Sequence, residues 1–116
     1  MMIEVFKSKI HRATITGANV NYMGSITIDP NLIEAANMFA GEKVQVLSLN
    51  NGTRLETYII SGQRGSGEVI MNGPAALKIQ QNHQVIIISY MFLRKNEING
   101  MNPTIIFPEE KTNKIV

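Results

Sequence analysis

Residues 44–53 read VQVLSLNNGT, and the architecture of the chain can be worked out from this stretch. Val44 and Val46 are interleaved with Leu47 and Leu49, so apolar residues fall on both faces, and Asn50-Asn51-Gly52 favours a tight hairpin turn. In the returning segment, residues 53–61, side chains alternate between two faces: Arg54, Glu56 and Tyr58 on one, and Leu55, Thr57 and Ile59 on the other. The pattern predicts a β-hairpin whose first strand is buried on both faces. Taken alone, it makes Arg54 and Tyr58 exposed residues of an edge strand.

Short apolar or β-branched runs on both sides of the hairpin predict further strands. They cover residues 3–16, 26–28, 68–72, 84–92 and 104–107, and the most apolar run, 84–92, is expected in the core. In the first strand, period-two counting places Lys9, His11 and Ala13 on one face. Residues 17–19 are expected to form a turn, and the polar residues 109–116 to be frayed or disordered.

Two helices are expected, and both are short. Asp29 and Pro30 are typical of a helix start, and apolar residues follow at helical spacing as far as Phe39, before a stop at Gly41. Pro74 begins a helix of one turn that ends at residue 77. Six or seven short strands with two small helices, and no alternation of strands and helices, predict a compact, mainly β barrel.

Length and composition limit the possible classes of protein. A chain of 116 residues forms one domain, and its charged fraction of 17% is low against roughly 25% in typical soluble domains. So few charges predict that part of the surface is buried in a homo-oligomer. The net charge is +2, but Lys and Arg are scattered along the chain. Nucleic acid is therefore not an expected partner, although the charge alone does not exclude it.

Several kinds of site and location are not expected. The chain has no cysteine, which excludes disulfides, thiol nucleophiles and thiolate metal sites, and its two histidines, His11 and His83, are far apart, so no metal is expected. Charges in the first nine residues do not fit a signal peptide. The longest apolar run, residues 85–93, is about half the roughly 20 residues that a membrane-spanning helix needs. We expect a soluble, cytoplasmic protein without membrane contact.

Residues 21–26, which read NYMGSI, carry the strongest chemical signal. The Ser25 hydroxyl is next to the carbonyl of Gly24, and a glycine at this position can adopt backbone angles that bring the two together. The alternative interpretation is a solvated turn that opens the next strand. Gly65-Ser66 is a second such pair, in a glycine-rich loop that lacks the ending and the helix of a phosphate-binding loop.

Several motifs occur together in one order. They are Lys9-Ile10-His11-Arg12, Tyr22-Met23-Gly24-Ser25, Asn51-Gly52-Thr53-Arg54 with Thr57-Tyr58, Arg64-Gly65-Ser66, and Asn72-Gly73-Pro74-Ala75-Ala76. In this order and spacing the chain resembles the pyruvoyl-dependent aspartate decarboxylases, from Lys9 to Tyr90. The resemblance implies a double-psi β-barrel and a homotetramer with active sites between subunits.

The resemblance also implies a proenzyme that cuts itself. Ser25 would attack the carbonyl of Gly24, turning the amide into an ester, and elimination followed by hydrolysis would leave a pyruvoyl group derived from Ser25. The products would be a β chain, residues 1–24, and an α chain, residues 25–116. A Schiff base on this carbonyl would accept the electrons released when L-aspartate loses CO2 to give β-alanine, a step of pantothenate biosynthesis.

Site residues follow from the resemblance, position by position. Arg54 would bind the substrate carboxylate that stays, for which its planar guanidinium is suited. Tyr58 would reprotonate the α-carbon, and Thr57 would stabilise the oxyanion or ester during self-cleavage. The substrate site would also include Lys9, Thr57, Asn72, Gly73 and Ala75, and His11 and Tyr22 are assigned to the processing region. Whether one subunit supplies all of them stays open.

Three positions depart from the family pattern. Met23 stands where many relatives carry an acidic residue, Leu47 where an aromatic is frequent, and Pro74 where alanine is frequent. Pro74 also removes one backbone N–H donor.

The alternative function is a non-catalytic β-barrel binding module that holds oligonucleotides with Tyr and Phe faces. Intact mass under denaturing conditions distinguishes the two, because a binding module stays whole.

Overall fold

The computed structural model describes residues 1–116 and contains one mixed sheet of eight strands with short helices. The elements, in chain order, are β1 (Met2–Thr14), β2 (Gly17–Asn19), β3 (Ser25–Ile28), α1 (Pro30–Ala35), β4 (Lys43–Ser48), β5 (Arg54–Ser61), β6 (Val69–Asn72), η1 (Gly73–Leu77), β7 (Gln84–Arg94), η2 (Lys95–Gly100) and β8 (Thr104–Ile106). The predicted mainly β class is confirmed. The strands number eight because residues 17–19, expected to form a turn, pair with β6 as a strand of their own.

The strands close into a ring. Neighbouring strands follow the order β2, β6, β3, β5, β4, β7, β1 and β8, and β2 continues β1 after only two residues. At this junction the chain changes partner, because Ile15 N donates to His83 O near β7 whereas Thr16 N donates to Val69 O of β6 (both 2.8 Å). Counting β1 and β2 as one bent strand, six strands form the closed wall and β8 adds to its outside. This ring is consistent with the small barrel that the sequence predicted.

The hydrophobic core fills the inside of this ring. Its fully buried members come from most of the wall strands: Ile10, Ile26, Ile28, Val44, Val46, Ile59, Met71 and Ile87. The predicted hairpin is confirmed, with β4 antiparallel to β5 and Leu47 opposite Arg54. The expectation that the first hairpin strand is buried on both faces is wrong, because β4 alternates and Leu49, just after it, is exposed. Since β5 pairs with β3 as well as β4, it is not an edge strand.

Strand β1 contains two irregularities in its pairing with β7. The register shifts between Phe6 and Ser8 and again between His11 and Ala13, where Arg12 has a left-handed φ of 67°. A β-bulge of this kind changes the face on which the following side chains lie. Ala13 is therefore in the core, whereas His11 is only partly buried. The expectation that Lys9, His11 and Ala13 share one face is wrong for this reason.

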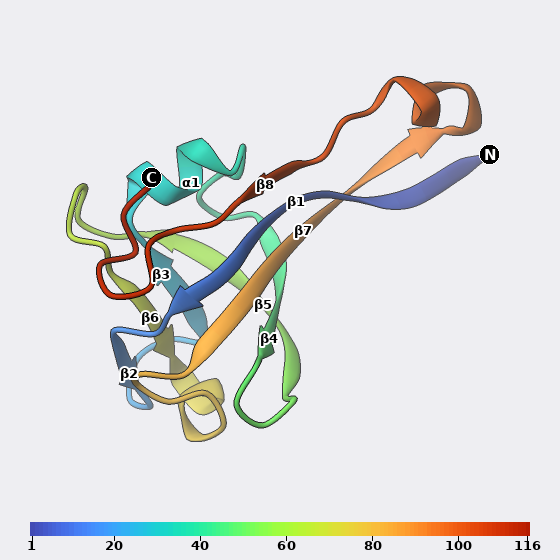
Figure 1. Ribbon diagram of the computed structural model, residues 1–116. Coiled ribbons are helices and arrows are strands. Elements are labelled where there is room, and N and C mark those ends of the chain that lie inside the picture. The colour runs from blue at the N-terminus through green and yellow to red at the C-terminus, as the bar shows by residue number, and fades with distance from the viewer.

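The outer halves of β1 and β7 leave the barrel as a two-stranded arm (Figure 1). Met2 pairs with Arg94, and η2 forms the tip of the arm, an element that the sequence did not predict. The apolar run at residues 84–92 is therefore core only in its first part. Val85 and Ile87 are fully buried, whereas Phe92 is 62% exposed.

Helix α1 is shorter than expected. Asp29 caps it, accepting from Asn31 N at 2.8 Å, and Pro30 opens it as predicted. It ends at Ala35 because Asn37, with φ of 56°, turns the chain out of the helix, as asparagine does more readily than most residues. Phe39, expected on the buried helical face, is consequently 64% exposed. No helix of the structure has the length and apolar character needed to cross a membrane.

The C-terminal segment is ordered against the barrel, so the expectation of a frayed end at residues 109–116 is wrong. Glu109 N and Lys114 O form a hydrogen bond of 2.8 Å, which closes a turn. The side chain of Asn113, 2% exposed, accepts from Thr14 N (2.8 Å) and donates to Thr14 O (2.7 Å) and Gly67 O (2.8 Å). One buried amide thus fixes the end of the chain to β1 and to the glycine-rich loop.

Candidate active site

The Ser25 hydroxyl is buried at the beginning of β3. The residue has no exposed surface, and its Oγ donates to the carbonyl oxygen of Met23 at 2.8 Å. The amide of Asn72, which pairs with Ser25 across β3 and β6, donates to the same Oγ at 3.1 Å. The interpretation of Ser25 as part of a solvated turn is therefore wrong, although residues 20–24 before it are exposed. The hydroxyl oxygen keeps one lone pair free of these two bonds.

Asn72 is the residue that holds the Ser25 hydroxyl in place. It is 3% exposed, and its Nδ2 donates to Thr27 Oγ1 at 2.9 Å as well as to Ser25. Using both amide hydrogens on one strand locks the side-chain orientation. Thr27 is a residue that the sequence analysis missed. Its position two residues after Ser25, on the same face of a strand, was the signal that could have found it.

Gly73, next to Asn72, packs directly on the backbone of Gly24. Its φ is +82°, and a Cβ added to it would lie 2.6 Å from Gly24 Cα and 2.9 Å from Gly24 N. Gly24 itself does not have a positive φ, and a Cβ added there would meet nothing within 4 Å. The left-handed backbone that makes a glycine necessary is therefore found at residue 73, not at residue 24.

Thr57 and Tyr58 lie on β5, the other neighbour of β3. The strands are parallel with Ile26 beside Ile59, so one step back along both strands brings Tyr58 level with Ser25, and one more brings Thr57 level with Gly24. The predicted alternation is confirmed, since Tyr58 is exposed and Thr57 is partly buried. One end of β3 therefore brings together six of the predicted residues: Gly24, Ser25, Thr57, Tyr58, Asn72 and Gly73. The backbone carbonyl of Tyr22 also lies close to Gly73, and Ala75 follows Gly73 in η1.

Arg54 lies near the start of β5, on the outer face of the barrel, as Tyr58 does. Its Nη1 donates to Gln45 Oε1 at 2.9 Å, and the hydroxyl of Tyr90 donates to the same oxygen at 2.7 Å. Gln45 was not predicted as a site residue from the sequence, where a polar residue between Val44 and Val46 was the available signal. One amide oxygen therefore orients two polar side chains of the outer face.

Lys9 and His11 are not brought to Ser25 within one chain. Lys9 pairs with Ile88 on β7, Ile88 with Gln45 on β4, and Gln45 with Glu56 on β5, so several strands separate β1 from β3 on this side of the wall. Lys9 Nζ lies 4.7 Å from the centroid of the Phe6 ring. The ring of His11 lies 5.4 Å from that of Phe107, edge to face. Both side chains lie on apolar surface of the outer face.

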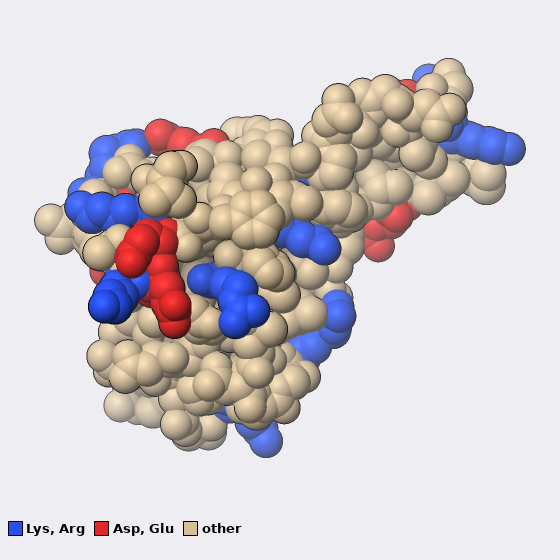
Figure 2. All heavy atoms as spheres, in the orientation of Figure 1, with Lys and Arg blue, Asp and Glu red and all other residues tan.

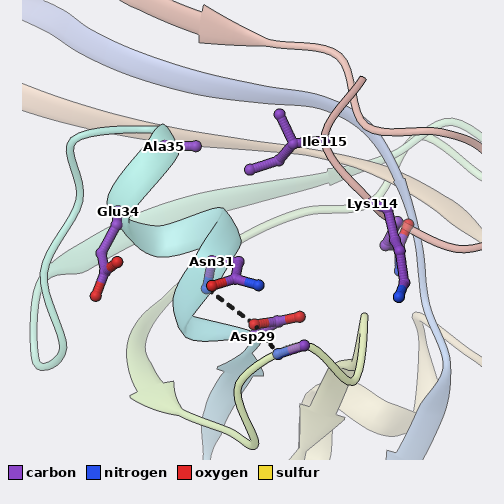
Figure 3. A pocket seen from close by; sticks show the side chains of 8 residues that line it. Asp29, Asn31, Glu34, Ala35, Lys114 and Ile115 are labelled. Atoms are coloured by element: carbon purple, nitrogen blue, oxygen red, sulfur yellow. Dashed lines mark hydrogen bonds between the residues drawn. The ribbon is translucent and has the colours of Figure 1, made fainter.

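Asp29 is the centre of a second polar cluster, at a hollow of about 540 Å³ beside α1 (Figure 3). Its carboxylate accepts from the backbone N–H groups of Asn31 (2.8 Å), Gly65 (3.0 Å) and Gly67 (2.8 Å). Burial alone raises the pKa of Asp29, but these donors and the charge of Arg64 outweigh it, so the pKa is lower than usual. The carboxylate is used to hold the glycine-rich loop, which makes this cluster structural.

Charged side chains are dispersed over the face shown in Figure 2, where Lys and Arg do not form one continuous patch and acidic groups lie among them. Arg64 and Glu34 form an exposed ion pair at 2.6 Å, which raises the pKa of Arg64 and lowers that of Glu34. No group of three or more His, Asp or Glu side chains is placed to hold a metal ion. This face gives no support to an oligonucleotide-binding surface.

Comparison with known proteins identifies the class as decarboxylases, because a family model described as Aspartate decarboxylase matches residues 1–116. Proteins named Aspartate 1-decarboxylase from Bacteroides fragilis and Bacteroides thetaiotaomicron are 59% and 57% identical over 100% of this chain and 99% of their own. One from Caldicellulosiruptor saccharolyticus is 54% identical over 100% of this chain and 90% of its own. The chain therefore belongs to the aspartate decarboxylase family. The enzyme interpretation is confirmed over the binding module.

Proposed function

We propose that this chain is a self-processing proenzyme that converts L-aspartate to β-alanine and CO2 in pantothenate biosynthesis. The observation that carries the proposal is the buried Ser25 hydroxyl, placed after Gly24 and held by the amide of Asn72 at 3.1 Å. A buried hydroxyl that a neighbouring strand holds in one place is suited to an attack on the adjacent peptide. Membership of the aspartate decarboxylase family supports a role for this serine in decarboxylation.

The self-cleavage follows from groups of the chain itself. Ser25 Oγ attacks the Gly24 carbonyl carbon, the C–N bond breaks, and an ester with a free amino group on Ser25 results. Loss of the α-proton of Ser25 then breaks the bond between Cβ and Oγ, which releases the carboxylate of Gly24 and leaves dehydroalanine at position 25. One water adds and ammonia leaves, which gives the ketone. The Asn72 N–H that holds Oγ in the serine also stabilises the negative charge that Oγ takes up as it departs.

The residues around Ser25 fit a pyruvoyl group formed in this place. Cβ of Ser25 is enclosed, Asn72 offers a donor that the departure of Oγ sets free, and Thr57 is level with the cut on the neighbouring strand. Once formed, the group supplies a conjugated carbonyl that accepts the electron pair left on the α-carbon when CO2 departs. No lysine-bound cofactor is needed for this chemistry.

Arg54, Lys9 and Tyr58 act on the substrate in this proposal. Arg54 binds the carboxylate that remains in β-alanine, because a strong ion pair to the departing carboxylate would stabilise the ground state more than the transition state. Its position on the outer face, oriented by Gln45, leaves further N–H donors of the guanidinium for this carboxylate. Lys9 adds positive charge, and Tyr58, on the strand beside Ser25, donates a proton to the α-carbon.

A homotetramer with sites between subunits is supported by two features. Lys9 lies on β1, several strands from Ser25 along the wall, and Arg54 lies at the start of β5, four residues before Tyr58, so a second subunit can bring both to a Ser25 that is not their own. The chain also leaves large apolar side chains exposed, among them Tyr58, Phe92, Ile105 and Phe107. Light scattering should give a tetramer, and a fully active monomer would contradict the shared site.

The decisive experiment is an intact-mass measurement under denaturing conditions, followed by an activity assay. We expect two chains that correspond to residues 1–24 and 25–116, with a pyruvoyl group at position 25. The processed protein should release CO2 from L-aspartate and form β-alanine, measured by chromatography. A single chain of full mass without activity would contradict the proposal. A cytoplasmic location fits this role, and fractionation of cells tests it.

A further inference from the structure

The connection formed by residues 20–24 arches over the end of β6. Strand β2 ends at Asn19, which pairs with Asn72, and strand β3 begins at Ser25, which pairs with Asn72 from the other side. The residues at both ends of this connection, Asn19 and Ser25, therefore pair with the same residue, Asn72. Gly73 follows that residue and lies, buried, beneath the arch.

The fit of the arch on Gly73 leaves no room for a side chain. A Cβ at position 73 would lie 2.6 Å from Gly24 Cα, 2.9 Å from Gly24 N and 3.3 Å from Tyr22 O. All three are backbone atoms, which cannot rotate away as the end of a side chain can. A side chain at residue 73 therefore has to lift the peptide that precedes Ser25.

A positive φ and a close contact with another backbone are two separate reasons for a glycine, and other glycines of this chain have only the first. Gly41, Gly52 and Gly65 also have a positive φ, of 88°, 74° and 83°, but a Cβ added to any of them would meet nothing within 4 Å. Gly73 has the same kind of backbone angle and, in addition, the contact with Gly24. Gly65 is its closest match in φ and supplies a control for backbone strain.

We propose that Gly73 is a positioning residue for self-cleavage. Because Gly73 lacks a Cβ, the backbone of residues 20–24 can pack directly on the end of β6. This packing keeps the Gly24 carbonyl next to the Ser25 hydroxyl that Asn72 holds. This role belongs to the uncut chain and is separate from any contact of Gly73 with substrate; it rests on the proposed function. Displacing reacting atoms by about 1 Å can cost about a hundred-fold in rate, so a methyl group at residue 73 should slow the cut by about that factor.

The test compares Gly73→Ala with Gly65→Ala and the unmodified chain. Each is synthesised in a short pulse of labelled amino acid, and the cut fraction is followed with time on denaturing gels. We expect the unmodified chain and Gly65→Ala to be cut at the same rate, and Gly73→Ala about a hundred-fold more slowly. Hydroxylamine, which cleaves the ester intermediate, should release less fragment from Gly73→Ala, because the acyl shift itself is hindered. Equal rates for Gly73→Ala and Gly65→Ala would overturn the proposal.

A second variant covers the case in which Gly73→Ala does not fold. One glycine inserted between Val20 and Asn21 loosens the arch and leaves Gly73 unchanged, and exposed loops tolerate such insertions. Cleavage should slow here too, with the melting temperature close to that of the unmodified chain. Cleavage at the unmodified rate would overturn the role of the close fit. If the unmodified chain itself stayed whole, the proposed function would fail instead, so the two failures can be told apart.

Discussion

The two Gly-Ser pairs of this chain have the same sequence and different surroundings. Ser25 is fully buried, and its Oγ bonds to Met23 O and to the amide of Asn72. Ser66 is exposed, and its Oγ donates to Gln63 O at 2.6 Å and accepts from Glu68 N at 3.1 Å, within its own loop. The difference is that a neighbouring strand holds the first hydroxyl, whereas the second only stabilises a turn. The surroundings of a dipeptide thus depend on partners that are distant in the sequence.

Exchanging each serine for alanine gives the sharpest test of this contrast. Ser25→Ala should fold and assemble but remain one chain, because the attacking hydroxyl is gone. Ser66→Ala should be cut as before. Intact mass under denaturing conditions measures both. If Ser66→Ala stays whole and Ser25→Ala is cut, the assignment of the two pairs is reversed.

Tyr58→Phe separates the making of the cofactor from its use. A phenol carries an O–H proton that it can donate to a carbanion. Self-cleavage does not require this hydroxyl, so the variant should give two chains and still trap aspartate under borohydride reduction. Its turnover should fall by roughly 10²–10⁴-fold.

Unchanged turnover of a fully processed Tyr58→Phe would remove Tyr58 as the proton donor. The role would then return to a bound water or to Lys9.

Asn72→Ala removes the hydrogen bond from a neighbouring strand to the serine hydroxyl, which Ser25 has and Ser66 lacks. Losing one hydrogen bond to Ser25 Oγ, worth about 1 kcal/mol, should slow the cut by about five-fold. Thr27→Val is the matched control, because it removes the other acceptor of the same amide and leaves Ser25 and Asn72 in place. Pulse labelling gives the rates. Equal slowing by both variants would mean that the shape of the site matters rather than the bond to Ser25.

Asp29→Asn acts on the loop of the second pair and should leave cleavage unchanged. Asp29 is 3% exposed and accepts three backbone N–H groups, so the variant should lose about 2–3 kcal/mol of unfolding free energy. The pKa of Asp29 is lowered below its unfolded value of 3.8. The carboxylate therefore stabilises the fold above about pH 4, and this contribution is lost as the pH falls through the folded pKa.

Urea unfolding from pH 7 to pH 3 measures this effect. The difference between the two proteins should shrink toward low pH, and a difference independent of pH would show that the charge of Asp29 contributes nothing.

Local signals in the sequence predicted the elements that depend on local chemistry. The turn at Asn50-Asn51-Gly52 and the cap at Asp29 were correct, and so was the mainly β class. The bulge at Arg12 could not be predicted, because one inserted residue leaves no mark in a loose alternation. Strand β2 exists only because β6 offers it a partner.

Site residues followed the same division. Ser25 was predicted as a site residue from its own dipeptide, but its bond to Asn72 joins residues that are 47 positions apart. The role of Gly73 depends on how close the backbone of Gly24 approaches, which no pattern of side chains records. Residues of a site can thus be named from sequence, whereas the way in which they hold one another requires the fold.

The buried amide of Asn113 has a consequence for a protein that has been cut after Gly24. The 24-residue fragment would then stay in place as a ligand of the larger one, by affinity alone. Its antiparallel ladder with β7, its short ladders with β6 and β8, and the two bonds of the Asn113 side chain to the backbone of Thr14 are what would hold it. The processed enzyme would thus be a non-covalent complex of two peptides, and the C-terminal turn that carries Asn113 would slow the dissociation of the smaller one.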